Sequence, residues 1–340
     1  QFALASSVEA IKDSAINLDK INKDRAGVIY GSGIGGLETM TNEHWKYFQD
    51  KNPAMISPFF VPMMISDLAA GQISIRFGLK GPNYATTSAC STASHAISDA
   101  FMVLERGSAD IMVCGGSEAS ITEIGIGGFN AMRALSTWND RYAEASRPFD
   151  KDRNGFVMGE GGGTLILEEL NHALSRGAKI YAELAGIGLT ADAHHITAPA
   201  PGGEGAVRSM KIAVEDAGLL LTDIDYINAH GTSTPHNDIN ETRAIKTLFG
   251  EHAYKLVVTS TKSMTGHLLG AAGAIEAIST ILSINNSLIP PTINLDNPDP
   301  ECDLDYSAKK VTKKEVNAAI SNTFGFGGHN ASILFKKFEE

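Results

Sequence analysis

Cys90 is the residue with the clearest potential for nucleophilic chemistry. Small and apolar residues after it recur at helical spacing and predict a helix over residues 91–106, whereas residues 84–88 are typical of a strand. Cys90 is then predicted at a strand-to-helix junction, where the helix dipole and unpaired backbone N–H groups stabilise a thiolate. A buried structural cysteine is the alternative, and position alone leaves the two even. For Cys114 and Cys302 we expect the structural role.

Two histidines stand in polar, glycine-containing motifs. His230 ends a predicted strand over residues 226–229, a usual place for active-site groups in α/β folds, although a hydrogen-bonded turn histidine is the alternative. His267 opens a predicted apolar helix over residues 268–284. A helix N-terminus disfavours imidazolium, so a neutral His267 could donate a hydrogen bond to a developing oxyanion.

Lys262 and Glu276 are charged residues in an otherwise apolar neighbourhood. A buried charge usually needs a partner, so the two are predicted to pair. An exposed lysine and a surface glutamate are the alternative, which the isoleucines around Glu276 disfavour.

Residues 324–328 form a second glycine-rich motif, Phe-Gly-Phe-Gly-Gly. Its glycines allow backbone N–H groups to turn inward as an oxyanion hole. They also allow Phe324 and Phe326 to swing as a gate, although the motif alone is only suggestive.

Two other patterns suggest cofactors and are set aside. Gly31–Gly36 fits the G-x-G-x-x-G dinucleotide motif, but that site needs an acidic residue about 20 positions later, where this chain has a proline-rich loop at residues 53–62. The histidines lack metal-site spacing, so no catalytic metal is predicted; those considered are His194, His195, His230, His236 and His267.

Composition and element order set the broad class. The 340 residues are 43% hydrophobic and 20% charged, which is ordinary for a globular protein. The net charge of −11 and the lack of basic runs argue against nucleic acid, and no apolar span long enough for a membrane is present. Three cysteines cannot form a disulfide framework, so a cytoplasmic location is expected. Strands and helices alternate throughout, which predicts an α/β fold.

Together the motifs resemble the β-ketoacyl-[acyl-carrier-protein] synthase family, and within it the elongating type II enzymes. A Cys-His-His set with the intervening lysine motif is far more specific than any single match, and the resemblance covers essentially the whole chain. The matching stretches are residues 31–36, 57–62, 87–90, 147–150, 155–161, 228–235, 260–276, 290–296 and 324–328.

The resemblance implies a thiolase-like, five-layered α-β-α-β-α fold built from two pseudo-symmetric halves and working as a homodimer. We expect the halves at residues 1–172, with the cysteine, and 173–340, with the histidines. The family's opening strand and next helices are absent from this sequence, so an N-terminally truncated chain is expected.

The resemblance also implies the reaction. Cys90 would take an acyl chain from acyl carrier protein as a thioester, and His230 and His267 would promote decarboxylation of malonyl-carrier protein and steady the enolate that attacks it. Backbone N–H groups of Cys90 and Phe326 would form the oxyanion hole. The substrates arrive on phosphopantetheine, and no further cofactor is implied.

Further residues match positions with supporting roles in the family. These are Lys262 and Glu276 for histidine geometry; Thr232 and Thr234 for the pantetheine arm; Phe324, Phe326, Phe129 and Ile34 for the acyl pocket and gate; Arg133 for carrier-protein docking; and Asn228, Glu276 and Ser321 for a structural cation.

Three alternatives are weighed. A degradative thiolase would need a second cysteine in the C-terminal glycine loop, which lacks one. A polyketide or aryl-polyene ketosynthase would share this active site and differ in substrate. A non-catalytic chain-length partner subunit would lack the nucleophile, whereas Cys90 and both histidines are present.

Overall fold

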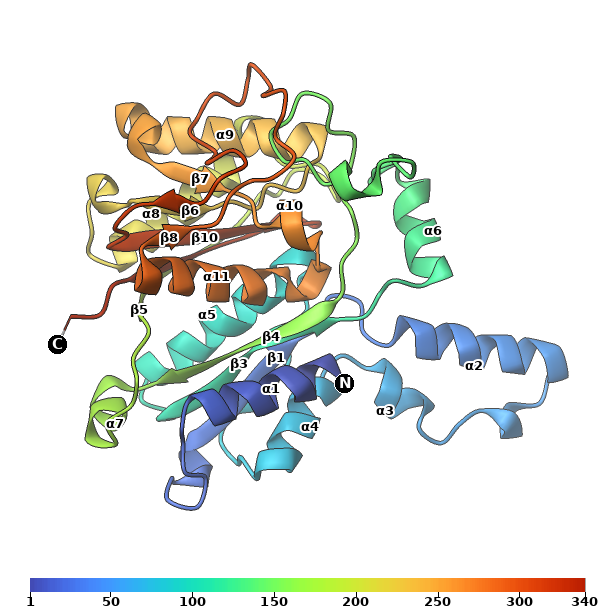
Figure 1. Cartoon of the computed structure of the whole chain (residues 1–340). Coiled ribbons are helices and arrows are strands. Elements are labelled where there is room, and N and C mark those ends of the chain that lie inside the picture. Colours follow the sequence, from blue (N-terminus) through green and yellow to red (C-terminus); the bar gives the residue numbers. More distant parts are fainter. Residues whose placement is uncertain (340) are drawn as a thin grey trace.

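Two β-sheets alternate with three layers of helices in the computed structural model, which describes residues 1–339 (Figure 1). The first sheet has the order β2-β1-β3-β4, formed by Asn83–Tyr84, Ala26–Gly31, Ile111–Glu118 and Gly161–Glu168. The second has the order β5-β11-β10-β6-β7, formed by Glu183–Ala191, His329–Lys336, Ala318–Gly325, Tyr226–Asn228 and Val257–Thr259. A small ribbon pairs β8, Leu288–Ile289, with β9, Thr312–Lys313.

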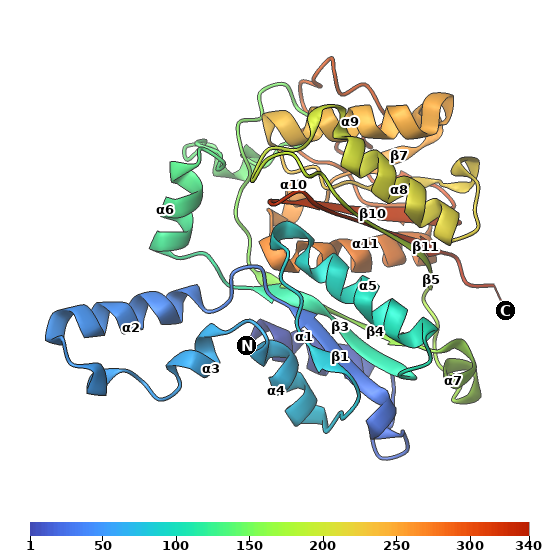
Figure 2. The same cartoon turned by 180° about the vertical axis from the view of Figure 1, so that it is seen from behind.

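The main helices cover both faces of both sheets (Figures 1 and 2). One outer layer is α1 (Phe2–Asp13) and α4 (Leu68–Phe77), and the central layer is α5 (Thr92–Glu105) and α11 (Ala272–Asn286). The other outer layer is α8 (Glu204–Asp216) and α9 (Pro235–Phe249). The remaining helices are α2 Leu37–Asp50, α3 Phe60–Met64, α6 Glu123–Ala131, α7 Leu170–Ser175 and α10 Lys262–Thr265. No helix within residues 1–339 is long and apolar enough to cross a membrane. The predicted five-layered α/β fold is confirmed.

Small side chains allow the two central helices to pack between the sheets. Ala93 and Ala96 of α5 and Ala274 and Ala277 of α11 are fully buried in one core cluster. Close packing of this kind leaves little room for larger residues, because a Cβ on Gly273 would lie 2.2 Å from a side-chain oxygen of α5. The N-terminal ends of α5 and α11 therefore meet in the middle of the molecule.

The turns that lead into these two helices have matching backbone conformations. Each is a short 3₁₀ turn, Ala89–Ser91 before α5 and Leu269–Ala271 before α11. The first residue of each has a positive φ, 50° for Ala89 and 49° for Leu269. A non-glycine residue in this region is strained by ~1–3 kcal/mol and persists where the surroundings impose it. The two central helices are thus preceded by equivalent turns.

The structure corrects several expected boundaries. The strand expected over residues 84–88 ends at Tyr84, and the helix expected directly after His267 begins at Ala272. The loop expected around Pro62 contains α3, because proline is tolerated in a first helical turn. Helix α6 was not predicted, since its glycines disfavour a helix, but the Thr122 hydroxyl caps its N-terminus.

Candidate active site

Cys90 lies in the 3₁₀ turn before α5, with 8% of its surface exposed. Burial raises the pKa of its thiol to about 11, while the Lys262 ammonium and the Phe326 backbone N–H act in the opposite direction. The helix N-terminus was expected to favour the thiolate, but burial outweighs it here. The resting thiol is therefore protonated at neutral pH.

Two buried imidazoles share this site with Cys90. The closest ligand atoms of Cys90, His230 and His267 all lie within 4.8 Å of one another. The two imidazole rings are nearly perpendicular, with centroids 5.3 Å apart. Burial, and next the Lys262 charge, hold the pKa of both histidines well below 6.5. Both rings are therefore neutral at neutral pH.

Hydrogen bonds fix which nitrogen of each ring carries the proton. The Leu269 backbone N–H donates to Nδ1 of His267 at 3.3 Å, and the Lys262 ammonium lies 3.4 Å from Nδ1 of His230. Because Nδ1 accepts in both cases, the ring proton resides on Nε2. His267 precedes α11 by several residues, so burial and Lys262 lower its pKa rather than the expected helix dipole.

Lys262 and Glu276 form an ion pair that is almost completely buried. The Lys262 ammonium also donates to the backbone carbonyl of His230 at 2.6 Å. Burial raises the pKa of Glu276, whereas its lysine partner lowers it. The pair expected from the sequence therefore forms, and it connects α11 to the turn that carries His230.

A second buried carboxylate supports the same turn. Glu241 of α9 accepts the backbone N–H groups of His230 and Gly231, both at 2.8 Å. Burial raises the pKa of Glu241 to about 7. Sequence reasoning missed this residue, since its helical surroundings are polar and its contacts are backbone groups eleven and ten residues away.

The glycine loop after β10 lies against the nucleophile. A Cβ on Gly325 would lie 2.9 Å from the Ser88 carbonyl oxygen and 3.2 Å from the Cys90 nitrogen. The Phe326 backbone N–H is directed at the Cys90 sulfur. Two backbone donors are therefore close to the position of an acyl oxygen on Cys90, as an oxyanion hole requires.

Aromatic rings line the approach to the imidazoles. The Phe324 ring centroid lies 5.8 Å from that of His230. On the other side, the Phe156 centroid lies 5.2 Å from His267 and 5.4 Å from Phe129. Phe156 was not singled out from the sequence, although it belongs to the matching stretch 155–161. These contacts place Phe324 beside His230, and Phe129 beside the ring that contacts His267.

The remaining predicted site residues lie at increasing distance from this centre. The hydroxyls of Thr232 and Thr234 are 2.9 Å apart on the turn that follows His230. Ile34 is 42% exposed, in the loop that follows β1. Arg133 is exposed just after α6 and makes no ion pair within the described part of the chain. The structure therefore does not bring Arg133 into the cluster around Cys90.

Three buried oxygens next to the ion pair lack a partner among residues 1–339: Asn228 Oδ1, Glu276 Oε2 and Ser321 Oγ. Asn228 and Ser321 are opposite each other on β6 and β10, and the Asn228 amide donates to the Glu276 carbonyl at 3.1 Å. Hard oxygen donors of this kind fit a monovalent or divalent cation. Cys90 and the two histidines form a different set, one sulfur and two imidazole nitrogens, which are ligand types that zinc accepts.

Two family models match the chain. The model described as Beta-ketoacyl synthase, N-terminal domain, matches residues 1–173, and that described as Beta-ketoacyl synthase, C-terminal domain, matches residues 181–296.

Similar proteins cover nearly the whole chain. A 3-oxoacyl-[acyl-carrier-protein] synthase 2 of Synechocystis sp. is 54% identical over 99% of this chain and 81% of its own length. A protein of that name from Staphylococcus aureus strain COL is 55% identical over 100% of this chain and 81% of its own.

Solved structures agree in fold. A beta-ketoacyl synthase from Burkholderia phymatum STM815 has a TM-score of 0.93 and 36% identity, over 99% of this chain and 81% of that one. A chain from the AntDE:AntF structure, a type II PKS acyl-carrier protein in complex with its ketosynthase bound to the hexaketide, has a TM-score of 0.97 and 35% identity, over 100% and 84%.

Proposed function

Because the chain belongs to the β-ketoacyl synthase family, we propose that it condenses acyl-[acyl-carrier-protein] with malonyl-[acyl-carrier-protein] during fatty-acid chain elongation. The products are 3-oxoacyl-carrier protein, carbon dioxide and free carrier protein. The observation that carries the proposal is the buried set of one thiol and two neutral imidazoles within 4.8 Å. The relatives named synthase 2 support fatty-acid elongation as the reaction.

The first step transfers the acyl group. The Cys90 sulfur attacks the carbonyl carbon of the incoming thioester, and the backbone N–H groups of Cys90 and Phe326 hold the oxyanion of the tetrahedral intermediate. The bond to the pantetheine sulfur then breaks, and the thiol proton of Cys90 leaves with the free carrier protein. Since the thiolate is the attacking form, burial works against this step, whereas the Lys262 charge and the Phe326 backbone N–H favour the thiolate.

The second step forms the carbon–carbon bond. Malonyl-carrier protein loses carbon dioxide, and the electron pair of the broken bond becomes an enolate whose oxygen accepts hydrogen bonds from the Nε2–H groups of His230 and His267. The enolate carbon attacks the Cys90 thioester, the carbon–sulfur bond breaks, and the expelled thiolate takes up one proton from solvent, which neutralises the charge that the malonyl carboxylate brought in. Lys262 and Glu276 hold His230 in place through the contacts described above.

The other predicted residues fit supporting roles around this chemistry. Thr232 and Thr234 contact the pantetheine arm; Phe129, Phe324 and Phe326 shape and gate the acyl channel; Ile34 limits its depth; and Arg133 docks the acidic carrier protein. The reaction needs no cofactor beyond the phosphopantetheine of the substrates, and we place the enzyme in the cytoplasm.

A structural cation fits the three unpartnered oxygens. Asn228, Glu276 and Ser321 would hold it, and it would neutralise the buried carboxylate from the side opposite Lys262. Its binding is measurable without an activity assay. Potassium or magnesium should raise the melting temperature of the native protein relative to tetramethylammonium, and by less in Ser321→Ala.

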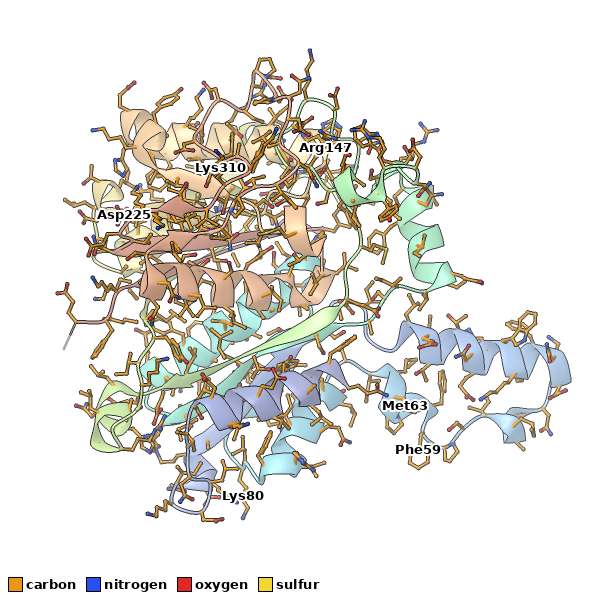
Figure 3. All side chains as sticks on the ribbon, in the orientation of Figure 1. Phe59, Met63, Lys80, Arg147, Asp225 and Lys310 are labelled. Atoms are coloured by element: carbon orange, nitrogen blue, oxygen red, sulfur yellow. The ribbon has the colours of Figure 1, made fainter. Side chains whose placement is uncertain are left out.

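A homodimer accounts for an apolar arm, residues 37–65, that projects from the body (Figures 1 and 2). Eight large apolar side chains of the arm are exposed: Trp45, Tyr47, Phe48, Met55, Phe59, Val61, Met63 and Ile65. Phe59 and Met63 lie at α3, on the lower edge of the arm in Figure 3. The exposed strand β2 pairs only with β1 among the described strands, so one edge is free for a second copy.

The proposed reaction is tested by mixing the protein with a medium-chain acyl-carrier protein and malonyl-carrier protein and measuring 3-oxoacyl-carrier protein by mass spectrometry. A single two-carbon extension is expected, and Cys90→Ala should abolish it. Repeated extension to a poly-3-oxo chain would indicate a polyketide synthase instead. Absence of any product would indicate a non-catalytic partner subunit and refute the proposal.

A further inference from the structure

Glu118, the last residue of β3, accepts hydrogen bonds from two separate loops and is only 2% exposed. Its Oε2 atom accepts the backbone N–H groups of Gly33 at 2.8 Å and Gly270 at 3.1 Å. Its Oε1 atom accepts the hydroxyls of Ser32 at 3.0 Å and Ser120 at 3.2 Å. The backbone N–H of the residue after Gly33 also donates to Oε1, at 3.3 Å.

This carboxylate has no cationic partner within residues 1–339. Burial raises the pKa of Glu118, and the surrounding N–H and O–H donors lower it. The glycine-rich segment 31–36 therefore encloses a carboxylate of the protein itself, in the way that such segments enclose phosphate. A Cβ on Gly33 or Gly270 would lie 2.7 Å or 2.6 Å from Oε2, so larger residues would displace the carboxylate.

The two loops that meet at Glu118 both lead to the active site. Gly33 precedes Ile34 and lies against the nucleophile turn, since a Cβ on it would be 3.2 Å from the Ala89 carbonyl. Gly270 follows His267 by three residues, in the turn whose Leu269 N–H fixes the imidazole tautomer. Glu118 thus holds together the segment of Gly33 and Ile34, here called the acyl-pocket loop, and the turn from His267 to Gly270, here called the histidine turn.

We propose that Glu118 is a positioning residue that fixes the acyl-pocket loop against the histidine turn and thereby sets which acyl chain lengths Cys90 accepts. This inference rests on the proposed condensation and on the place proposed for Ile34 in the acyl pocket. It gives Glu118 an indirect role, because the carboxylate reaches Ile34 and His267 only through backbone N–H groups.

The variant Glu118→Gln should affect the hydrogen bonds to the acyl-pocket loop and leave the bond to the histidine turn in place. Backbone N–H groups can only donate, so the glutamine oxygen must occupy the Oε2 position, where two of them converge. The amide NH₂ then occupies the Oε1 position, where the hydroxyls of Ser32 and Ser120 can reverse and accept. Only the N–H of Ile34 is left without an acceptor. The substitution therefore loosens Ile34 while the link between Gly33 and Gly270 remains.

The experiment measures acyl loading on Cys90 with carrier proteins bearing chains of graded length, and malonyl decarboxylation in parallel. Glu118→Gln should change the ratio of long-chain to medium-chain loading by about five-fold, the effect of one lost hydrogen bond, and should change that ratio more than it changes decarboxylation. Glu118→Ala removes both links, so decarboxylation should also fall by at least about ten-fold.

Glu168→Gln is the matched control. Its carboxylate is also buried, but it binds Arg176 and His172 at the far end of β4, away from the site. This control should keep the wild-type chain-length ratio at a similar loss of stability in urea. If Glu118→Gln does not fold, Ser120→Ala takes its place, because it removes one donor to Oε1 and should shift the same ratio to a smaller extent.

An unchanged ratio in the folded Glu118 or Ser120 variant, or an equal change in Glu168→Gln, would overturn the role of Glu118. Failure of the proposed reaction would look different, since the wild-type protein itself would then neither load nor decarboxylate.

Discussion

Substitutions in the buried pair of Lys262 and Glu276 should affect stability and catalysis in different ways. Replacing Glu276 with Gln leaves the Lys262 ammonium in a site where it is 1% exposed, and replacing Lys262 with Met leaves the Glu276 carboxylate equally isolated. Each single change removes one partner of a buried ion pair. The double variant Lys262→Met with Glu276→Leu removes both charges and keeps a similar volume.

The expected magnitudes follow from burial. An uncompensated buried charge costs ~3–5 kcal/mol, so each single variant should lose about that much free energy of unfolding, and the double variant should recover most of it. Catalysis should not recover. Without Lys262, the hydrogen bond to the His230 carbonyl is lost, and with it the contact at Nδ1 that sets the ring proton.

Urea unfolding midpoints and malonyl decarboxylation, measured on the same three variants, test this separation. We expect decarboxylation to fall by at least ~10² in the Lys262→Met and double variants, since each oxyanion donor is worth that much. A double variant as unstable as either single one would show that the ion pair is not what stabilises this region. A double variant with wild-type decarboxylation would refute the positioning role of Lys262.

Three further predictions concern the imidazoles and the glycine loop. His267→Ala should lower malonyl decarboxylation by ~10²–10³ and acyl loading by much less, and a larger loss of loading would show that its role is misassigned. Because the pKa values of His230 and His267 lie well below 6.5, the active neutral forms persist to acidic pH, and decarboxylation rates should stay level as the pH falls through 6.5. At that pH the two imidazoles bind protons only in the unfolded chain, so they lower the stability in urea on acidification, whereas Glu241, whose pKa burial raises to about 7, binds a proton in the folded chain and acts in the opposite direction. A rate loss centred at 6.5 would contradict burial of the imidazoles. Gly325→Ala should slow acyl loading at least ten-fold, since its Cβ meets the Ser88 carbonyl and Cys90 nitrogen, whereas Gly71→Ala, with one distant neighbour at 3.9 Å, should load normally.

Features encoded locally in the sequence could be predicted before the structure. Helical spacing after Cys90 placed it at the start of a helix, and strand Tyr226–Asn228 led to His230 as expected. The charges of Lys262 and Glu276 indicated a buried pair because a charge in apolar surroundings needs a partner of opposite sign.

Features that depend on distant packing could not be predicted. Glu118 receives backbone N–H groups from positions 85 and 152 residues away, which no local pattern reveals. The raised pKa of Cys90 depends on burial in the assembled centre, whereas sequence position indicated only a helix N-terminus. Helix α6 forms despite three glycines of poor helix propensity, with the Thr122 hydroxyl as its N-terminal cap.

The most direct test of the proposed reaction follows the acyl group itself. The protein is mixed with a medium-chain acyl-carrier protein, its intact mass is measured and the modified peptide is mapped, before and after addition of malonyl-carrier protein. We predict a single acyl adduct on Cys90 that disappears when malonyl-carrier protein is added, as 3-oxoacyl-carrier protein forms. An adduct on another residue, or one on Cys90 that malonyl-carrier protein does not discharge, would contradict the assignment of Cys90 as the condensing nucleophile.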